Sequence, residues 1–226
     1  MQATQTDSGK LLFDDEAILV ISDIADYRHD LHPAEQELIA GAILKRTLEF
    51  TTGRYCAHQG LHKLGITDFP ILRGEQREPI WPEGIVGSIA HCHDIAGAVV
   101  AKKRNIKSVG LDLERRKHVM PEIARHICTD DEISWIRQQG TDRQNLSLLI
   151  LFSLKEAVFK CVYQATRVQL KFKQCVVSLD QTSGKASARL YSPGISLRAD
   201  ELAVRFALTD THVISAVSWR YLPAVG

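Results

Sequence analysis

Several patterns that would define the class of a protein are missing from these 226 residues. The amino terminus lacks the basic-then-apolar pattern of a secretory signal, and no run approaches the roughly eighteen apolar residues that a membrane span requires. The cysteines are odd in number and contain no Cys-x-x-Cys, which indicates reduced thiols in a reducing compartment. The 28 basic and 27 acidic residues nearly cancel, so no bulk charge attracts nucleic acid. We therefore expect a soluble cytoplasmic protein without a membrane span or a nucleic-acid partner.

What is present is a mixture of helical and strand patterns. Helices are predicted at 33–52, 55–64, 121–126, 130–139 and 146–163, and the prolines over 66–84 indicate a long ordered loop. Strands are predicted at 17–22, 85–90, 95–101, 108–114, 174–180, 186–191, 201–208 and 212–220. These elements mix without regular β-α-β alternation, which favours an α+β fold over a doubly wound sheet. The length allows one large or two small domains.

Two short segments carry the residues of most chemical interest. Residues 109–114 (Val-Gly-Leu-Asp-Leu-Glu) predict a strand on which Asp112 and Glu114 project from one face and Leu113 points into the core. Residues 152–160 (Phe-Ser-Leu-Lys-Glu-Ala-Val-Phe-Lys) predict a helix with Glu156 and Lys160 on one face. Three carboxylates and an ammonium suit a hard divalent cation held against phosphate oxygens. Taken singly, the first pattern is more typical of a solvated strand edge, and the second of a helical ion pair.

The two segments in this order, about forty residues apart, resemble the signature of the 4′-phosphopantetheinyl transferases. That signature is a Gly-x-Asp-x-Glu strand followed by a helix with [Phe/Trp]-[Ser/Thr]-x-Lys-Glu-[Ala/Ser]-x-x-Lys, and the chain matches it in full. Upstream residues narrow the resemblance to the enterobactin-synthase component D type, and the matched region covers residues 41 to 172. These residues are Arg46, Gly53-Arg54, the Phe-Pro-Ile at 69–71 and the segment 79–91.

The resemblance implies a fold and a reaction. We expect two similar α+β subdomains, 1–111 and 112–226, related by a pseudo-twofold axis with the active site in the cleft between them. The family moves the 4′-phosphopantetheine arm of coenzyme A onto a serine of an apo acyl or peptidyl carrier protein and releases adenosine 3′,5′-bisphosphate. Mg²⁺ is expected as cofactor, with Mn²⁺ as a substitute, and coenzyme A as co-substrate. A monomer is expected, and the subgroup favours nonribosomal peptide or siderophore carriers, although similar enzymes serve fatty-acid and polyketide carriers.

The resemblance also gives roles to the signature residues. Asp112 and Glu114 match the metal ligands, and Asp112, Glu156 and Lys160 are the expected catalytic residues. Glu156 matches a carboxylate that is either a third metal ligand or the base for the serine, and both roles stay open here. Lys160 matches a lysine that contacts the phosphates. For Lys155 the sequence leaves a solvated position and a phosphate contact equally open.

Coenzyme A carries a separate 3′-phosphate that needs cations of its own. The resemblance assigns Arg46, Arg54 and His91 to it, and the planar guanidinium suits phosphate geometry. Arg73 and Arg77 lie in the loop where the family contacts the nucleotide. Ala90 replaces the usual serine or threonine before the histidine, so a hydroxyl contact is missing, which Ser88 or a backbone amide is available to replace.

Other interpretations make different predictions. A catalytically silent carrier-protein or coenzyme A binding module on the same fold is the principal alternative, but the intact signature disfavours it. A two-metal nuclease or phosphatase predicts a basic face that the charge balance does not support. The run His91-Cys92-His93 suggests a transition-metal site, but on a strand only the two histidines share a face, and no third ligand is evident nearby in the sequence.

Overall fold

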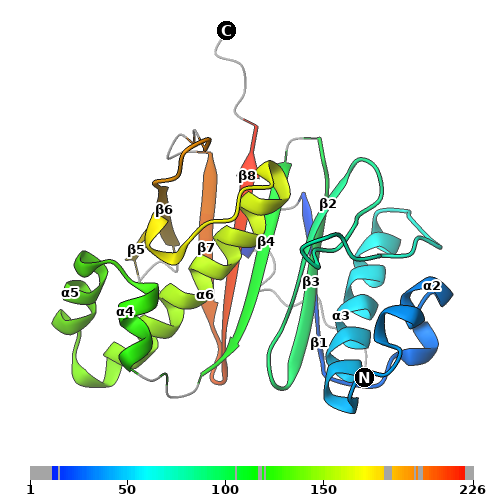
Figure 1. The fold of residues 1–226 in the computed structure, drawn as a ribbon, viewed down its shortest axis with the longest axis horizontal. Coiled ribbons are helices and arrows are strands. Elements are labelled where there is room, and N and C mark those ends of the chain that lie inside the picture. Colours follow the sequence, from blue (N-terminus) through cyan, green and yellow to red (C-terminus); the bar gives the residue numbers. More distant parts are fainter. Residues whose placement is uncertain are drawn as a thin grey trace, which may run out of the picture.

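A computed structural model describes residues 12–14, 16–104, 106–116, 119, 121–180, 185–195, 197 and 201–221. The chain forms two antiparallel sheets side by side, each covered by a long helix (Figure 1). This arrangement confirms the predicted α+β class. Among the described residues, no helix is both long enough and apolar enough to cross a membrane.

The N-terminal half contains a three-stranded sheet in the order β1-β3-β2. Its strands are β1 (Ala17–Asp23), β2 (Ile85–His91) and β3 (Ile95–Lys102). Helix α3 (Leu44–Lys63) packs on this sheet through buried residues such as Cys56 and Leu61. Short helices precede it, namely the 3-10 helix Arg28–Asp30, α2 (Pro33–Gln36) and the 3-10 helix Glu37–Ile39.

The C-terminal half contains a five-stranded sheet in the order β4-β8-β7-β6-β5. The strands are β4 (Ile106–Arg115), β5 (Cys175–Asp180), β6 (Lys185–Leu190), β7 (Leu202–Leu208) and β8 (His212–Arg220). Helix α6 (Thr141–Thr166) packs against it. The smaller helices are the 3-10 helix Pro121–Ile123, α4 (Ala124–Ile127), α5 (Asp130–Gln138) and the 3-10 helix Phe172–Gln174. Thr129 caps α5 by accepting a hydrogen bond from the Glu132 amide.

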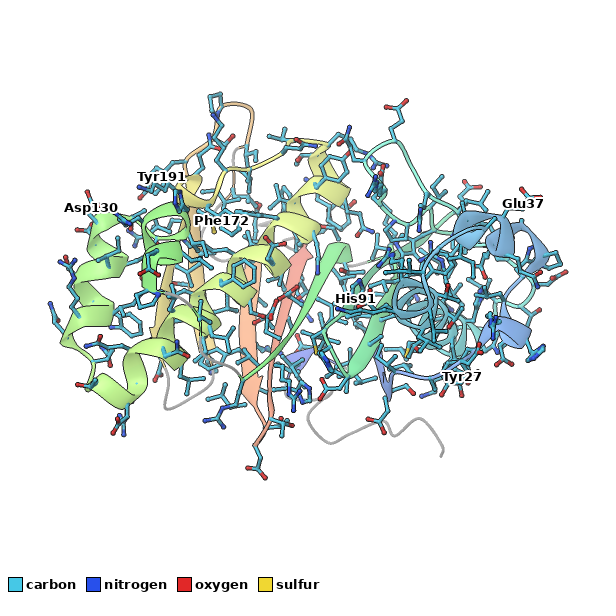
Figure 2. All side chains as sticks on the ribbon, turned by 60° about the horizontal axis from the view of Figure 1, so that its bottom comes forward. Tyr27, Glu37, His91, Asp130, Phe172 and Tyr191 are labelled. Atoms are coloured by element: carbon cyan, nitrogen blue, oxygen red, sulfur yellow. The ribbon has the colours of Figure 1, made fainter. Side chains whose placement is uncertain are left out.

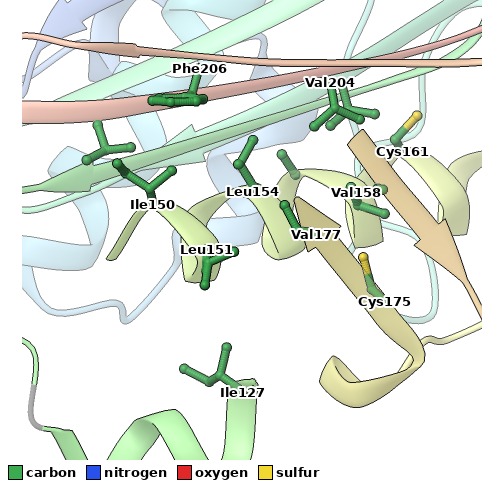
Figure 3. Close-up of a cluster of buried hydrophobic side chains, with 14 of the residues drawn as sticks. Ile127, Ile150, Leu151, Leu154, Val158, Cys161, Cys175, Val177, Val204 and Phe206 are labelled. Carbon is green, nitrogen blue, oxygen red and sulfur yellow. The ribbon is translucent and has the colours of Figure 1, made fainter. Parts of the chain in front are cut away.

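The core of the C-terminal half lies between α6 and this sheet (Figure 3). Leu151, Leu154, Val158 and Val162 are fully buried on α6 and form one apolar stripe along it. Across from them lie side chains of the sheet, including Val204 and Phe206 (Figure 3). The stripe fixes the rotation of α6 and so decides which side chains face the other half of the molecule.

The two halves repeat one topology. In the first, a strand, a helix and a hairpin (β1, α3, β2-β3) form the sheet order β1-β3-β2. In the second, β4, α6 and the hairpin β7-β8 form the order β4-β8-β7, to which β5 and β6 are added. A boundary between residues 111 and 112 falls inside β4, whose whole length belongs to the five-stranded sheet.

Strands β2 and β4 pack against each other where the two sheets meet, although each belongs to a different sheet. Side chains connect their backbones. The Leu111 amide donates to Ser88 Oγ at 3.1 Å. Gln164 donates through Nε2 to the Gly87 oxygen at 2.7 Å and accepts from the Val109 amide at 3.3 Å. We call this junction of β2 and β4 the seam.

The predicted break between the helices 33–52 and 55–64 is at the wrong position. The helix that opens at Pro33 ends within two turns, and a single helix then runs from Leu44 to Lys63. The break lies at Gly41, whose φ of +75° is incompatible with a right-handed helix. Gly53, which lies between the two predicted helices, is inside α3, where a Cβ atom would meet the Ile89 side chain at 2.9 Å. This glycine therefore allows a close approach of helix and sheet rather than a turn.

Candidate active site

Asp112 lies where α6 packs against β4, and both of its carboxylate oxygens accept hydrogen bonds. Lys160 Nζ donates to Oδ1 at 2.8 Å, and Ser153 Oγ donates to Oδ2 at 2.9 Å. Lys160 Nζ also donates to the Leu111 oxygen at 2.9 Å. The strand segment and the helix segment found in the sequence thus meet at one point, through a charge-assisted hydrogen bond.

Glu156 lies three residues after Ser153 and four before Lys160, on the same side of α6. Burial raises the pKa of Glu156; Lys160 opposes this shift, and the charge of Asp112 adds to it. A carboxylate with a raised pKa is a better proton acceptor near neutral pH than an exposed glutamate. The position therefore suits a base as well as a metal ligand.

Glu114 is half-buried and follows Asp112 at a spacing of two on β4, while Leu113 between them is buried in the core, as predicted. Carboxylate oxygens are the donors that a hard cation such as Mg²⁺ prefers, so this chemistry fits the expected ion. Within the described parts of the chain, however, Asp112, Glu114 and Glu156 do not form a cluster of ligand atoms all within 4.8 Å of one another. The cluster that meets this condition lies at Cys92, Asp94 and His212.

A cavity of about 770 Å³ opens beside this site. Loop residues 76–81, residues 85–89 of β2 and the α6 residues Glu156, Phe159, Lys160 and Tyr163 line it. Arg77 is among the lining residues and adopts a positive φ of 65°. The cavity is therefore lined by side chains of both halves. The charged groups Glu156 and Lys160 and the aromatic rings of Trp81, Phe159 and Tyr163 are among them.

A second hollow, of about 520 Å³, has His91 and Glu114 among the residues that line it. Figure 2 shows His91 in the middle of the molecule. Arg46 Nη1 lies 2.9 Å from His91 Nε2, and because a guanidinium only donates, the ring nitrogen accepts. Glu49 lies 3.7 Å from His91 Nδ1 and 3.6 Å from Arg46. Burial lowers the pKa of His91, and this favours the neutral ring that the hydrogen bond requires.

Arg54 is more deeply buried than Arg46 and His91, with which it is predicted to bind the 3′-phosphate. Its side chain is 6% exposed, lies 3.7 Å from the buried Glu35 and stacks 4.5 Å from the centre of the Phe50 ring. Arg73 approaches the same ring at 5.2 Å. Burial lowers the pKa of Arg54 to about 10, so it stays charged at neutral pH. Among the described atoms its Nε has no hydrogen-bond partner.

Ala90 is buried against the core, and the Ser88 hydroxyl accepts the Leu111 amide at the seam. Ser88 is therefore already used in joining β2 to β4.

Comparison with known proteins agrees with this geometry. Residues 34–101 match the model of the 4′-phosphopantetheinyl transferase N-terminal domain, and residues 108–216 match that of the 4′-phosphopantetheinyl transferase superfamily. The chain is 33% identical to 4′-phosphopantetheinyl transferase Svp of Streptomyces mobaraensis over 83% of this chain and 78% of that protein. The chain belongs to the 4′-phosphopantetheinyl transferases.

Other relatives of this transferase fit the same assignment. It is 34% identical to 4′-phosphopantetheinyl transferase PptT of Mycobacterium tuberculosis over 82% of this chain and 84% of that protein. Enterobactin synthase component D of Salmonella typhi is 35% identical over 59% of this chain and 56% of its own length. The resemblance to the 4′-phosphopantetheinyl transferases seen in the sequence is confirmed, and relatives of the enterobactin-synthase type are among the matches. As a member of the family, the protein is an enzyme that acts on coenzyme A and carrier proteins.

Lys155 of the transferase signature neither faces solvent nor reaches the phosphate site, so both alternatives left open by the sequence are wrong. Its ammonium is fully buried, 2.6 Å from Glu132 Oε2, and donates to the backbone oxygens of Ile127 at 2.8 Å and Phe172 at 3.2 Å. Glu132 in turn accepts from the amides of Thr129 and Val177. The pair joins α5, α6 and β5, and it holds the helix that carries Glu156.

Sequence reasoning matched Ser153 to the signature but gave it no role, and it did not single out Gln164. Both share the face of α6 that carries Glu156 and Lys160, at the positions 153, 156, 160 and 164. Ser153 fixes the second oxygen of Asp112, and Gln164 connects the two strands of the seam. The helical spacing from Glu156 was the available signal for both residues.

Proposed function

We propose that this transferase moves the 4′-phosphopantetheine arm of coenzyme A to a serine of an apo acyl or peptidyl carrier protein, with Mg²⁺ or Mn²⁺, and releases adenosine 3′,5′-bisphosphate. The contact between Asp112 and Lys160 is the observation that carries the proposal, because it joins the two signature segments at one place. The serine oxygen attacks the β-phosphorus, the bond to the bridging oxygen breaks, and the serine proton goes to a base. The site must neutralise the phosphate oxygens, orient the hydroxyl and take that proton.

Asp112 and Glu114 are the proposed metal ligands, with Glu156 as a third ligand or as the base. A bound Mg²⁺ supplies positive charge to the pyrophosphate oxygens and orients them. Ser153 holds Asp112 Oδ2 and so fixes the rotation of the carboxylate. Lys160 lies beside Asp112 with a side chain 32% exposed, which leaves its ammonium available to the leaving phosphate.

Glu156 is the proposed acceptor of the serine proton if it acts as the base. Its half-buried position raises its pKa, which improves a base whose ordinary pKa is too low for the task. Lys160, one helical turn away, limits the rise of this pKa. The same charge pattern is compatible with a metal ligand, and the two roles are separated by experiment below.

Arg46 and His91 are the proposed contacts of the 3′-phosphate at the smaller hollow. Their mutual hydrogen bond points both side chains to one place. Arg73 and Arg77 lie on the loop that leads to the larger cavity, where they would meet the remaining nucleotide phosphates. Arg54 lies behind them, against Phe50 and Glu35, and adds positive charge from within.

The pantetheine arm is proposed to enter the larger cavity beyond Lys160. The arm is long and uncharged, and Trp81, Phe159 and Tyr163 offer apolar walls to it. In this arrangement the N-terminal half holds the nucleotide, and the C-terminal half holds the metal and the reacting groups. The carrier serine reaches the β-phosphorus from solvent, and we propose a cytoplasmic monomer as the active form.

Mass spectrometry of apo carrier proteins tests the proposal. The purified protein, coenzyme A and Mg²⁺ should add one phosphopantetheine group to the serine of a carrier, and a chelator should stop the reaction. A panel of nonribosomal peptide, siderophore, polyketide and fatty-acid carriers identifies the preferred one; the relatives named enterobactin synthase component D favour the first two classes. If coenzyme A binds but no carrier of the panel is modified, the protein is instead a silent binding module.

A further inference from the structure

Three potential metal ligands from distant parts of the chain meet at one end of the seam. Cys92 and Asp94 lie in the turn between β2 and β3, and His212 begins β8. His212 Nε2 lies 2.8 Å from Asp94 Oδ1, and Cys92 Sγ lies 3.6 Å from the same oxygen. All three ligand atoms lie within 4.8 Å of one another. The histidines of the His-Cys-His run are not part of this group.

The ligands are held by neighbours of the kind that surround metal-binding side chains. Thr211 Oγ1 lies 2.8 Å from His212 Nδ1, so the second ring nitrogen has a partner and Nε2 is aimed at Asp94. Arg115 Nε lies 3.7 Å from Asp94 Oδ2, which leaves Oδ1 facing His212 and Cys92. The turn itself is fixed, because the Cys92 amide donates to the Ile95 oxygen at 2.9 Å. Such outer partners orient the ligands before an ion arrives.

The donor set selects a class of metal. A thiolate, an imidazole and a carboxylate suit Zn²⁺ or Co²⁺, whereas Mg²⁺ prefers oxygen ligands only. Bonds of roughly 2.0–2.3 Å in a tetrahedral site place ligand atoms about 3.3–3.6 Å apart. The Cys92–Asp94 distance of 3.6 Å already fits, and the Asp94–His212 distance of 2.8 Å must open by a few tenths of an ångström.

We propose that Cys92, Asp94 and His212 bind a Zn²⁺-type ion that joins the N-terminal half to the C-terminal half, separately from the carboxylate site at Asp112. The ion replaces the direct Asp94–His212 contact with bonds to both side chains and to the Cys92 sulfur, and water fills the fourth position. When the ion binds, the Cys92 thiol releases its proton to solvent, and the charges of the resulting thiolate and of the Asp94 carboxylate balance those of the ion. His212 and Arg115 lower the pKa of Asp94, so this carboxylate is charged over the whole neutral range.

Cobalt spectroscopy of the full-length protein tests the site, and it does not depend on transferase activity. Titration with Co²⁺ should give a near-ultraviolet thiolate-to-cobalt charge-transfer band that saturates at one ion per chain, and Zn²⁺ should abolish it. The band identifies Cys92, because Cys56, Cys128, Cys161 and Cys175 are all fully buried. Cys92→Ser should remove the band, and His212→Gln should weaken Co²⁺ binding at least tenfold. Asp112→Asn, which changes the carboxylate site, should keep it.

A thermal unfolding series gives the second measurement. Zn²⁺ should raise the unfolding midpoint of the wild type relative to chelator, and this difference should vanish in Cys92→Ser. Each variant is compared with itself, with and without metal. The effect of the substitution on the stability of the metal-free protein therefore cancels. The inference is overturned by the absence of a sulfur band in the folded wild type, by a band that persists in Cys92→Ser, or by a stoichiometry of one ion to two chains.

Discussion

Arg46 and Arg54 carry the same charge on the same helix, but they lie in different environments. The Arg46 side chain is 45% exposed and contacts His91, whereas Arg54 is buried beside Glu35. Replacing Arg46 should therefore affect ligand binding. Replacing Arg54 would also remove a charged neighbour of the buried Glu35 carboxylate. For this reason Arg46, rather than Arg54, is the informative position for the 3′-phosphate.

Arg46→Ala should raise KM for coenzyme A at least tenfold and leave kcat nearly unchanged. A charged hydrogen bond contributes about 1.5–3 kcal/mol, and the 3′-phosphate lies away from the reacting phosphorus, so binding energy is lost equally from ground state and transition state. Steady-state kinetics with a carrier protein measure both constants. Dephospho-coenzyme A is the control substrate, since its KM should not respond to the variant. Equal losses with both substrates would remove Arg46 from the phosphate site.

The Glu156→Gln variant distinguishes the two possible roles of Glu156, the base for the serine and a metal ligand. If Glu156 is the base, kcat should fall by roughly 10²–10⁴ while the half-saturating Mg²⁺ concentration stays constant. If it is chiefly a ligand, half-saturating Mg²⁺ should rise and excess metal should restore part of the rate. Asp112→Asn serves as the comparison, because Asp112 is proposed only as a ligand and should show the metal-dependent pattern. Wild-type turnover in Glu156→Gln would contradict both roles.

The pH dependence of the same variant gives an independent check. The pKa of Glu156 is raised above its ordinary 4.5, so the carboxylate loses its charge, and the enzyme its base, as pH falls through the raised value. The acidic limb of kcat/KM should disappear in Glu156→Gln. Because the raised pKa means that the charged form destabilises the folded state, Glu156→Gln should be at least as stable as wild type at pH 7, an advantage that fades on acidification towards 4.5. Denaturant unfolding at several pH values measures it.

At the scale of elements, the distance between β4 and α6 determines whether Asp112 and Lys160 meet. Gly110 sets that distance, since a Cβ atom there would lie 1.9 Å from the Ala157 backbone oxygen. The glycine is thus required by the approach of helix backbone to strand backbone, not by a special backbone conformation.

Gly110→Ala should destabilise the protein by about 3 kcal/mol or more, because backbone atoms, unlike side-chain ends, cannot move aside at low cost. It should also lower kcat, since α6 must shift away from Asp112. Gly140→Ala is the matched control at the start of α6: nothing lies within 4 Å of its Cβ position, and we expect a loss of at most about 1 kcal/mol. Urea unfolding and initial rates measure the two effects. Similar stabilities for both variants would show that the helix does not rest on Gly110.

Periodicity in the sequence predicted most of the elements but not their ends or their deepest polar contacts. The strands have alternating or continuous apolar runs, and these were found close to their observed bounds. The division of the first helices was missed because Gly41 and Gly53 look alike in sequence, and only the packing against Ile89 distinguishes them. Lys155 was misjudged because its partner, Glu132, lies on another helix 23 residues away. A charged side chain gives no sequence signal of being buried.

At the scale of the whole molecule, the site exists because two sheets meet without sharing a hydrogen-bonded strand pair. The proposed phosphate contacts Arg46 and His91 come from one half, and Asp112, Glu156 and Lys160 come from the other. The signature motif indicated these residues, but not how the halves are held together, since Ser88 and Gln164 contact backbone atoms far away in the chain. Family resemblance thus identified the chemistry, and three-dimensional packing identified the seam.

Gln164→Leu should loosen the seam. The substitution keeps the size of the side chain but leaves the Gly87 oxygen and the Val109 amide without their shared partner, at a cost of about 1–3 kcal/mol for each buried group. Small displacements of β2 relative to β4 then move His91 away from Asp112, so kcat/KM for coenzyme A should fall at least tenfold although Gln164 is not proposed to touch the reacting atoms. Gln169→Leu is the matched control, because Gln169 also reaches the N-terminal half, 2.9 Å from Gln76, but at an exposed site. This control should stay within about 0.5 kcal/mol of wild type. If the two glutamine variants are equally stable and active, β2 and β4 are held together by apolar packing alone.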